Sequence, residues 1–595
     1  MHCAMVKLSS GGASKKVKCL VLILSLLRVL PAVANEFAAT NAPESLYRSI
    51  EQVRSQCLAD RRMVCGKILR VLPEGLVVES GYTDLLRPPL TASWLVPGGV
   101  SAARTPNLVE SSIPGSPVVG TIFLTDLPRL RGKKPKPYDY VILLAYPAGQ
   151  YTYPSVGAVR KTVRHFSGNL AVAAGSQIAE RRWAEVQLHL PPNLNGALPK
   201  LLSQTGVFRD VTNLVPEEYM LPYAVNVPFW SDGAQKRRWV CVPPGELVHF
   251  SRAGEWSFPP GTVFVKTFEL ALDETHAEIS RRLETRLLVC DDTGGVYGVV
   301  YKWRPDNSDA DLLETNLTED IAIKTANASR QQEWYYPSRE DCLTCHTANA
   351  GYVLGVKTRQ LNRDLQYPNG STENEIVAWQ KLGLFDVDFT AADVKAFPSL
   401  APMEDLSRSL ADRARSYLDA NCASCHRPDG TVANFDARYD TPLENQGIVD
   451  GRVLIDERID GARVVAPNDV WRSLLLLRLH TVGGYQMPPL ARNTIDENGA
   501  RLLRAWIESL PGPRVLVPPQ ILPPGGTFSA PVKVALQSEA GATIYYTLDG
   551  TVPTPKDSLY QKPFVIAEPT IVRAKAFKPG CKKSVTAREF FLFNQ

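Results

Sequence analysis

Two pentapeptides with the pattern Cys-x-x-Cys-His combine residues that can do redox chemistry. Cys342, Cys345 and His346 form the first motif, and Cys422, Cys425 and His426 form the second. In this pattern two thiols can add to the vinyl groups of haem while the adjacent imidazole reaches the iron. A thioredoxin-like redox pair does not require the histidine, and a zinc site needs two such pairs held close together, whereas these begin 80 positions apart. We therefore predict two covalently attached c-type haems, with His346 and His426 as iron ligands.

Met487 is the expected second axial ligand of the haem held by the second motif. It lies in the segment Gln486-Met487-Pro488-Pro489-Leu490, and the chain has six methionines in all. A thioether ligand favours Fe(II) and raises the reduction potential. The sequence does not identify the second axial ligand of the first haem. The candidates there are Met403, His249, His276, Met220 and Lys266, and a five-coordinate site that accepts a small molecule is the alternative.

Helices are expected around the second motif and strands before the first. A helix beginning near Asp405 leads into Cys422, a short apolar helix covers 473–480, and Asp496 is a candidate N-cap of the last helix. The apolar face of that last helix consists of Leu502, Leu503, Trp506, Ile507 and Leu510. Residues 67–72, 140–145, 286–290, 299–303, 543–548 and 570–577 are predicted strands, and 263–269 alternates as a half-buried strand does.

The first 34 residues have the features of a signal peptide. Lysines precede the apolar run Cys19 to Leu30, and Ala32-Val33-Ala34 is a small-x-small cleavage site. A membrane anchor is the alternative, but the run is shorter than the ~20 apolar residues that a span needs. We expect a periplasmic, exported or cell-surface protein that contacts the membrane only transiently, through the signal peptide. The net charge of +5 without a basic stripe predicts no nucleic-acid partner.

Five cysteines outside the signal peptide and the two motifs are Cys57, Cys65, Cys241, Cys290 and Cys581. In an oxidising compartment Cys57 with Cys65 is a candidate short-loop disulfide, and Cys241 with Cys290 is a weaker one. Cys581 is left over as a free thiol.

The segment 405–512 resembles a class I cytochrome c. The resemblance lies in Tyr417-Leu418-Asp419-Ala420-Asn421-Cys422-Ala423-Ser424-Cys425-His426-Arg427-Pro428, in Met487-Pro488-Pro489 and in the helix that ends at Leu510. It implies a small helical fold that transfers single electrons and leaves no open position on its iron.

A wider stretch, 196–512, resembles an uncharacterised bacterial family of exported two-haem c-type cytochromes. The matching residues are Pro222-Tyr223, Trp230-Ser231-Asp232-Gly233-Ala234 with Lys236 and Trp239, Pro260-Gly261-Thr262 with Lys266, Glu284-Thr285-Arg286-Leu287, Tyr301-Lys302-Trp303, Pro337-Ser338, and Leu354-Gly355 with Thr358-Arg359-Gln360-Leu361-Asn362. This resemblance implies architecture and haem content but no known reaction.

The segment 517–595 resembles the chitobiase/β-hexosaminidase C-terminal domain. The match is Ala542-Thr543-Ile544-Tyr545-Tyr546-Thr547-Leu548-Asp549-Gly550-Thr551-Val552-Pro553-Thr554 with Arg573-Ala574-Lys575-Ala576-Phe577. The resemblance implies an accessory β-sandwich, and Tyr545 or Tyr546 could stack on a sugar. Core aromatic residues on a strand are the alternative.

The sequence therefore predicts a multidomain fold with a β-rich N-terminal half, an α-helical class I cytochrome c domain and a C-terminal β-sandwich. The expected parts are a signal peptide (1–34), two β-rich domains (35–195 and 196–335), a first haem-binding segment (336–404), the cytochrome domain (405–512), and a linker with the sandwich (513–595).

The expected function is single-electron transfer between periplasmic or cell-surface redox partner proteins. One alternative is a dihaem peroxidase or oxidase with an open site at the first haem, for which Asp232, Lys266 and Glu284 are acid/base candidates. The other is a surface or polysaccharide-binding protein that carries haem, with carbohydrate bound by the C-terminal domain. An electron carrier is favoured over an enzyme.

Overall fold

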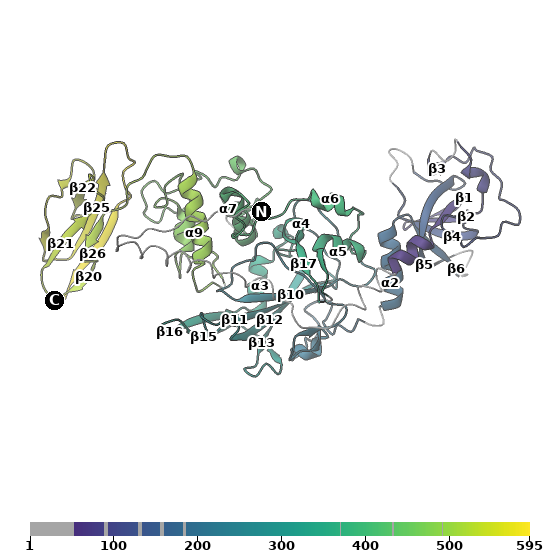
Figure 1. Cartoon of the computed structure of the whole chain (residues 1–595), viewed down its shortest axis with the longest axis horizontal. Helices are drawn as coiled ribbons and strands as arrows, with labels where there is room; N and C mark the ends of the chain where they lie inside the picture. Colours follow the sequence, from purple (N-terminus) through teal and green to yellow (C-terminus); the bar gives the residue numbers. More distant parts are fainter. Residues whose placement is uncertain are drawn as a thin grey trace, which may run out of the picture. The chain divides into compact units, whose positions relative to one another are not determined.

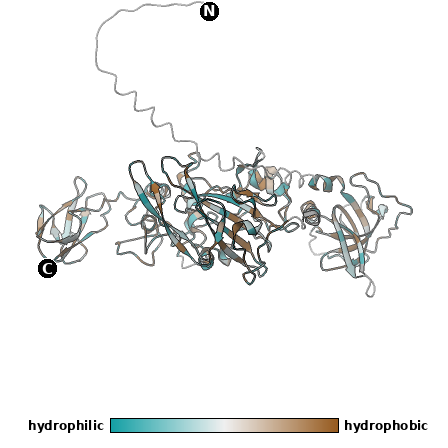
Figure 2. Ribbon diagram, turned by 90° about the horizontal axis from the view of Figure 1, so that it is seen from below, coloured by the Kyte–Doolittle hydropathy of each residue, from teal (hydrophilic) through white to brown (hydrophobic). Residues whose placement is uncertain are grey.

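A computed structural model describes residues 53–88, 93–128, 134–154, 160–182, 186–368, 370–430, 434–490 and 492–594 (Figure 1). The predicted signal peptide lies outside these residues. Strands outnumber helices among the described residues taken together, so the chain is β-rich. Hydrophobic residues recur along the strands and helices of each part (Figure 2). None of the described helices is long and apolar enough to cross a membrane.

The N-terminal part is a small barrel followed by a helix. Its elements are β1 (Arg62–Val71), β2 (Leu76–Ser80), β3 (Leu95–Val96), β4 (Gly120–Thr125), β5 (Tyr140–Pro154), β6 (Arg160–Ser167) and α2 (Leu170–Arg182). The sheet order is β1-β2-β4-β6-β5-β3, and β1 also pairs with β5, so five strands close into a ring. Alternate residues such as Val64, Ile68 and Ile122 fill its interior.

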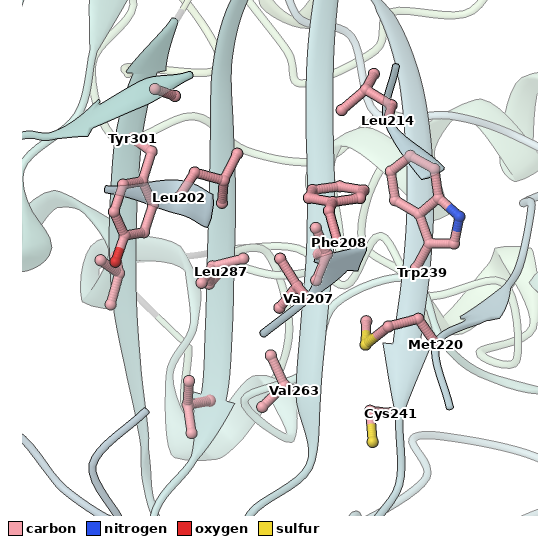
Figure 3. Packing of buried hydrophobic residues seen from close by; sticks show 14 of the residues in the cluster. Leu202, Val207, Phe208, Leu214, Met220, Trp239, Cys241, Val263, Leu287 and Tyr301 are labelled. Carbon is pink, nitrogen blue, oxygen red and sulfur yellow. The ribbon is translucent and has the colours of Figure 1, made fainter. Parts of the chain in front are cut away.

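The central part is an antiparallel sheet of order β14-β13-β12-β11-β10-β9. The bounds are β9 (Leu221–Pro222), β10 (Gln235–Cys241), β11 (Val263–Ala271), β12 (Ser280–Cys290), β13 (Val296–Trp303) and β14 (Ala310–Leu312). Two hairpins flank it, formed by β7 (Phe208–Asp210) with β8 (Val215–Pro216) and by β15 (Leu317–Lys324) with β16 (Ser329–Tyr336). On one face, Trp239, Leu287 and Tyr301 of the sheet pack against Leu202 and Phe208 (Figure 3).

The opposite face of this sheet is covered as well. Val240, Phe264 and Cys290 pack there against residues 353–394, including Trp379 and Phe385. The prediction of a half-buried strand at 263–269 is therefore only partly right. The strand exists as β11, but apolar layers on both faces bury nearly all of it.

Short elements follow the central sheet along the chain. They are α3 (Arg339–Cys345), α4 (Thr358–Leu361), β17 (Asp364–Gln366), β18 (Thr372–Asn374), α5 (Glu375–Lys381) and α6 (Ala391–Lys395). Asn374 caps α5 by accepting from the backbone amides of Ile376 and Val377. These elements supply the cover of the sheet face that carries the first motif.

The prediction of an α-helical class I cytochrome c domain over 405–512 is wrong. The described residues of this segment hold only three α-helices, α7 (Leu410–Cys422), α8 (Leu474–Leu479) and α9 (Glu497–Ser509). Between α7 and α8 lie a short 3-10 helix (Leu443–Asn445), turns and isolated bridges. Asp429, Asp450, Glu457, Arg458 and Asn468 have positive φ there, which a right-handed helix cannot accommodate.

The individual helices expected near the second motif do form. Asp496 caps α9 by accepting from the backbone amide of Gly499 at 2.9 Å. Gly499 is required because a Cβ at that position would lie 2.5 Å from the ring of Tyr417 on α7. The second motif begins at Cys422, the last residue of α7, and the close crossing of α7 and α9 holds that helix in place.

The last part consists of two small sheets. One has the order β20-β26-β25-β22-β23 and the other β19-β21-β24. The bounds are β19 (Gln520–Leu522), β20 (Gly526–Phe528), β21 (Val532–Gln537), β22 (Thr543–Thr547), β23 (Ser558–Leu559), β24 (Phe564–Ile566), β25 (Thr570–Phe577) and β26 (Ala587–Phe593). Val534, Ile544, Val572 and Phe591 form the core between them.

Cys57, Cys65, Cys241, Cys290 and Cys581 form no disulfide in the described structure, so neither candidate pairing is present. Cys241 and Cys290 belong to the hydrophobic clusters on opposite faces of the central sheet. Cys57 packs beside α2, whereas Cys65 lies on β1 within a different cluster.

Candidate functional site

Both motifs adopt the same backbone turn at the end of a helix. The amide of His346 donates to the carbonyl of Cys342 at 3.0 Å, and the amide of His426 donates to that of Cys422 at 2.9 Å. In a helical turn the positions i, i+3 and i+4 share one face. Each motif therefore gathers two thiols and one imidazole on one side of its turn. At the start of α3, a reciprocal cap between Ser338 and Asp341 fixes the turn of the first motif.

The fold brings the two motifs into contact. The thiols of Cys345 and Cys425 are hydrogen-bonded to each other, and this bond, together with burial, raises the pKa of Cys345. Arg427 Nη1 donates to the carbonyl of Asn349 at 2.8 Å, and the Asn349 side chain donates to the carbonyl of Asp429. The expectation that sequence separation keeps the two cysteine pairs apart is therefore wrong. No group of three or more His, Cys, Asp or Glu placed to hold a metal ion occurs in the described ranges.

The imidazole of His346 is held through one nitrogen. Its Nδ1 lies 2.6 Å from the carbonyl oxygen of Tyr352, an acceptor, so Nδ1 carries the proton and Nε2 keeps a free lone pair. Burial is the main cause that lowers the pKa of His346 to about 4, with the nearby cations of Lys266 and Arg286 adding to it. The side chain is therefore neutral at pH 7, which is the form that binds a metal.

His426 has a different environment. Its ring stacks on Phe435 with 4.1 Å between the centroids, and its Nδ1 is buried without a hydrogen-bond partner among the described residues. Burial, with a smaller effect of Arg478, lowers the pKa of His426 to about 4. This imidazole is neutral as well, and its orientation rests on aromatic packing rather than on a hydrogen bond.

A cavity opens beside the first motif. Its volume is about 200 Å³. Cys342, Cys345 and His346 form one wall, and Tyr223, Phe264, Phe268, Leu288 and Val353 are among the apolar residues of the others. Gly298 on β13 permits the approach of α3, because a Cβ there would lie 2.5 Å from the sulfur of Cys342.

Basic side chains line the cavity on the sheet side. Arg238, Lys266 and Arg286 are direct partners on the adjacent strands β10, β11 and β12. We call these three residues the cationic row. Burial is the first cause that lowers the pKa of Lys266 to about 7, and repulsion by Arg238 and Arg286 follows. The neighbouring Lys236, also in the wall, donates to the carbonyl of Phe229 at 2.5 Å.

The residues around the second motif complete the cavity wall. Lys357 pairs with Asp419 of α7 at 2.9 Å and with Glu255 at 3.6 Å. Arg427, next to the second motif, pairs with the same Glu255 at 2.7 Å. These four buried or half-buried charges connect the central sheet, the first motif and the second motif through one network.

The segment 230–232 anchors the loop that follows Met487. Asp232 Oδ1 accepts from the backbone amides of Asn493 and Thr494, both at 2.8 Å, and from the Thr494 hydroxyl at 3.0 Å. The backbone amide of Trp230 donates to Asn421 Oδ1 at 2.7 Å, one residue before Cys422. In the sequence this segment stands out only as part of a resemblance, because nothing in its pattern indicates which residues it contacts.

Met487 is half-buried in the loop after α8, and its amide donates to the carbonyl of Arg478 at 3.2 Å. Leu490 of the same loop lies in the cavity wall. The pairing of Met487 with His426 across an iron stays a prediction.

The candidate second ligands of the first haem differ in whether they lie beside the cavity. Lys266 lines the cavity. His249 is exposed and contacts Asp386, and His276 is exposed beside Asp273. Met220 is buried on the opposite face of the central sheet, and Met403 packs with the cluster around α7.

The other acid/base candidates have structural partners. Asp232 accepts hydrogen bonds from residues 493–494, and Glu284 is fully buried and pairs with Arg286 at 2.5 Å.

In the last part of the chain, Tyr546 stacks on Phe564 within the core, and Tyr545 contacts Phe577 edge-on.

Comparison with known proteins identifies one part of the chain. Residues 523–587 match the family model of the chitobiase/beta-hexosaminidase C-terminal domain. This match supports the resemblance of the last part of the chain, and the cytochrome resemblances have no match. No curated protein matches the chain, and no solved structure does.

Proposed function

We propose that this protein is an exported dihaem c-type cytochrome that passes single electrons between periplasmic or cell-surface redox partners. The observation that carries the proposal is the contact between the two Cys-x-x-Cys-His motifs at Cys345 and Cys425. Two electron-carrying groups attached at these cysteines would be held close to each other. A short separation between redox groups is what an internal relay requires.

The residues around the first motif fit a haem in three respects. The Tyr352 carbonyl fixes the tautomer of His346 that leaves Nε2 available. The cavity joins an apolar wall with a cationic one, as an apolar macrocycle with two carboxylates requires. Gly298 leaves space for the Cys342 sulfur. When bound, the haem would supply one-electron Fe(III)/Fe(II) chemistry.

The chain itself would hold and insulate the haems. Cys342 and Cys345 would attach the first haem, and Cys422 and Cys425 the second, with Met487 as the proposed second ligand of the latter. Trp230 and Asp232 support the segments on either side of the second motif, near Asn421 and Thr494. Neutral His346 and His426 would coordinate without first losing a proton.

Haem content tests the proposal directly. The exported protein is purified and its covalent haem counted by intact mass and by the pyridine haemochrome spectrum. We expect two haems per chain, one in the variant Cys342→Ala/Cys345→Ala and one in Cys422→Ala/Cys425→Ala. The control Cys581→Ser removes a thiol outside both motifs and should retain two. A chain without covalent haem would contradict the proposal.

A dihaem redox enzyme is the second candidate, favoured by one observation. The described residues that line the cavity include no methionine and no histidine besides His346, and Lys266 is the one candidate second ligand among them. Carbon monoxide added to the dithionite-reduced protein separates the two functions. A spectral change in about half of the haem would favour the enzyme, with peroxide as the first substrate to test, and no change would favour the electron carrier. Binding of carbohydrate by the C-terminal domain remains a separate prediction.

A further inference from the structure

The cationic row is an unusual arrangement for the interior of a sheet. Arg238, Lys266 and Arg286 stand directly opposite one another on three neighbouring strands, where strands are ~4.8 Å apart. Like charges in directly opposed positions destabilise a sheet. All three side chains line the same cavity, and Lys236 adds a fourth cation two positions from Arg238. Such a row needs negative charge nearby.

The acidic residues around the cavity leave one member of the row without an ion pair. Glu284 pairs with Arg286 at 2.5 Å, and Arg238 interacts electrostatically with the buried Glu375. Glu255 and Asp419 are engaged by Lys357 and Arg427, and Asp341 accepts from Tyr335 and from the backbone of Ser338. Within the described part of the chain, Lys266 has neither a hydrogen bond nor an ion pair. Lys266, which lies between the two arginines, is therefore the member of the row that can accept a further anion.

We infer that the cationic row binds a carboxylate or a similar small oxyanion inside this cavity. Arginine guanidinium groups match the two oxygens of a carboxylate, and a lysine between them adds a point charge. The anion has two possible sources, which are the carboxylates of a haem attached to the first motif and a free small carboxylate. If the anion is a haem carboxylate, the inference rests on the proposed function. If the anion is a free small carboxylate, the inference does not depend on the proposed function.

Acetate is the probe for the test. Its binding to the full exported protein is measured by calorimetry and by thermal shift, at constant ionic strength set with sodium chloride. The same titration is made on Cys342→Ala/Cys345→Ala, which removes the first attachment site. Saturable binding to both proteins identifies a free anion as the ligand. Binding to the double variant alone indicates that haem carboxylates occupy the row in the intact protein.

The residue-level test uses Lys266→Gln in both backgrounds. Lys266 has no partner in the described structure, so this change leaves no buried charge unpaired. Lys302→Gln is the matched control, because Lys302 lies on β13 of the same sheet but pairs with Glu319 outside the cavity. We expect acetate binding at least tenfold weaker in Lys266→Gln and unchanged in Lys302→Gln. Equal affinity in the two variants, or no saturable binding in any protein, would overturn the inference.

Two further measurements keep the outcomes distinct. The haem count of each preparation shows whether a failure concerns the haem proposal or the anion site. If the double cysteine variant does not fold, the midpoint potential of the first haem replaces its titration. Lys266→Gln should then lower that potential relative to Lys302→Gln, because a buried positive charge favours the reduced state. An unchanged potential together with no acetate binding to the intact protein would contradict the inference.

Discussion

The thiol of Cys345 is hydrogen-bonded to the thiol of Cys425, although 80 positions separate them in the chain. This contact joins the two Cys-x-x-Cys-His motifs. It depends on packing between the central sheet, residues 339–361 and α7, which the network of Glu255, Lys357, Asp419 and Arg427 links together. The proposed relay and the anion site both depend on this arrangement.

Gly298→Ala tests whether the close approach of α3 to β13 is needed for the first motif. The added Cβ would lie 2.5 Å from Cys342 Sγ, so the helix must shift. We expect a loss of about 1–3 kcal/mol in the free energy of unfolding and incomplete haem attachment at the first motif. Urea unfolding and intact mass measure the two effects. Gly99→Ala, where nothing lies within 4 Å of the added Cβ, is the control and should change neither.

Asp232→Ala tests the anchor of the loop that follows Met487. The change removes the acceptor of three hydrogen bonds from residues 493–494. We expect a destabilisation of about 1–3 kcal/mol and an altered spectrum of the second haem with little effect on the first. Asp232→Asn should have a smaller effect, because asparagine keeps one acceptor oxygen and tolerates the positive φ of 51°. The exposed Asp320→Ala is the control, and an equal loss there would contradict the anchoring role.

Glu375 predicts a pH dependence of stability. Its carboxyl is fully buried, and burial raises its pKa to about 8. The Ala224 N–H and the side chains of Arg363 and Arg238 favour the ionised form, but they offset only part of this rise. Because the folded state holds this proton more tightly than the unfolded state, its contribution is fully present below about pH 4.5 and is lost as the pH rises towards about 8.

Urea unfolding between pH 5 and pH 8 measures this effect. The wild-type free energy of unfolding should fall across that range more steeply than that of Glu375→Gln, which cannot ionise. Parallel pH profiles of the two proteins would show that Glu375 is not responsible.

The sequence predicted local structure well where a residue pattern determines it. The strands at 263–269, 286–290 and 299–303 form within β11, β12 and β13, and Asp496 caps α9 as expected. Local periodicity could not show that β11 is covered on both faces, because the covering residues lie about 100 positions later. The helical domain was predicted from resemblance. Turns and loops instead make up most of the described segment between α7 and α8, and five of its non-glycine residues have positive φ.

In the candidate site, too, local patterns predicted which residues group together but not which distant segments come into contact. The residues of each motif are adjacent in sequence, so their grouping was predictable. The contact between the motifs, the cationic row and the anchoring role of Asp232 arise from strand register and from packing between distant segments. The cationic row could have been predicted only with knowledge of the order and register of β10, β11 and β12.

The covalent haem count of the exported full-length protein tests the central claim most directly. Intact mass and the pyridine haemochrome spectrum should both give two haems per chain, with thioether bonds at Cys342, Cys345, Cys422 and Cys425 in peptide mapping. A protein without haem whose Cys345 and Cys425 are free, or joined to each other by a disulfide, would contradict it.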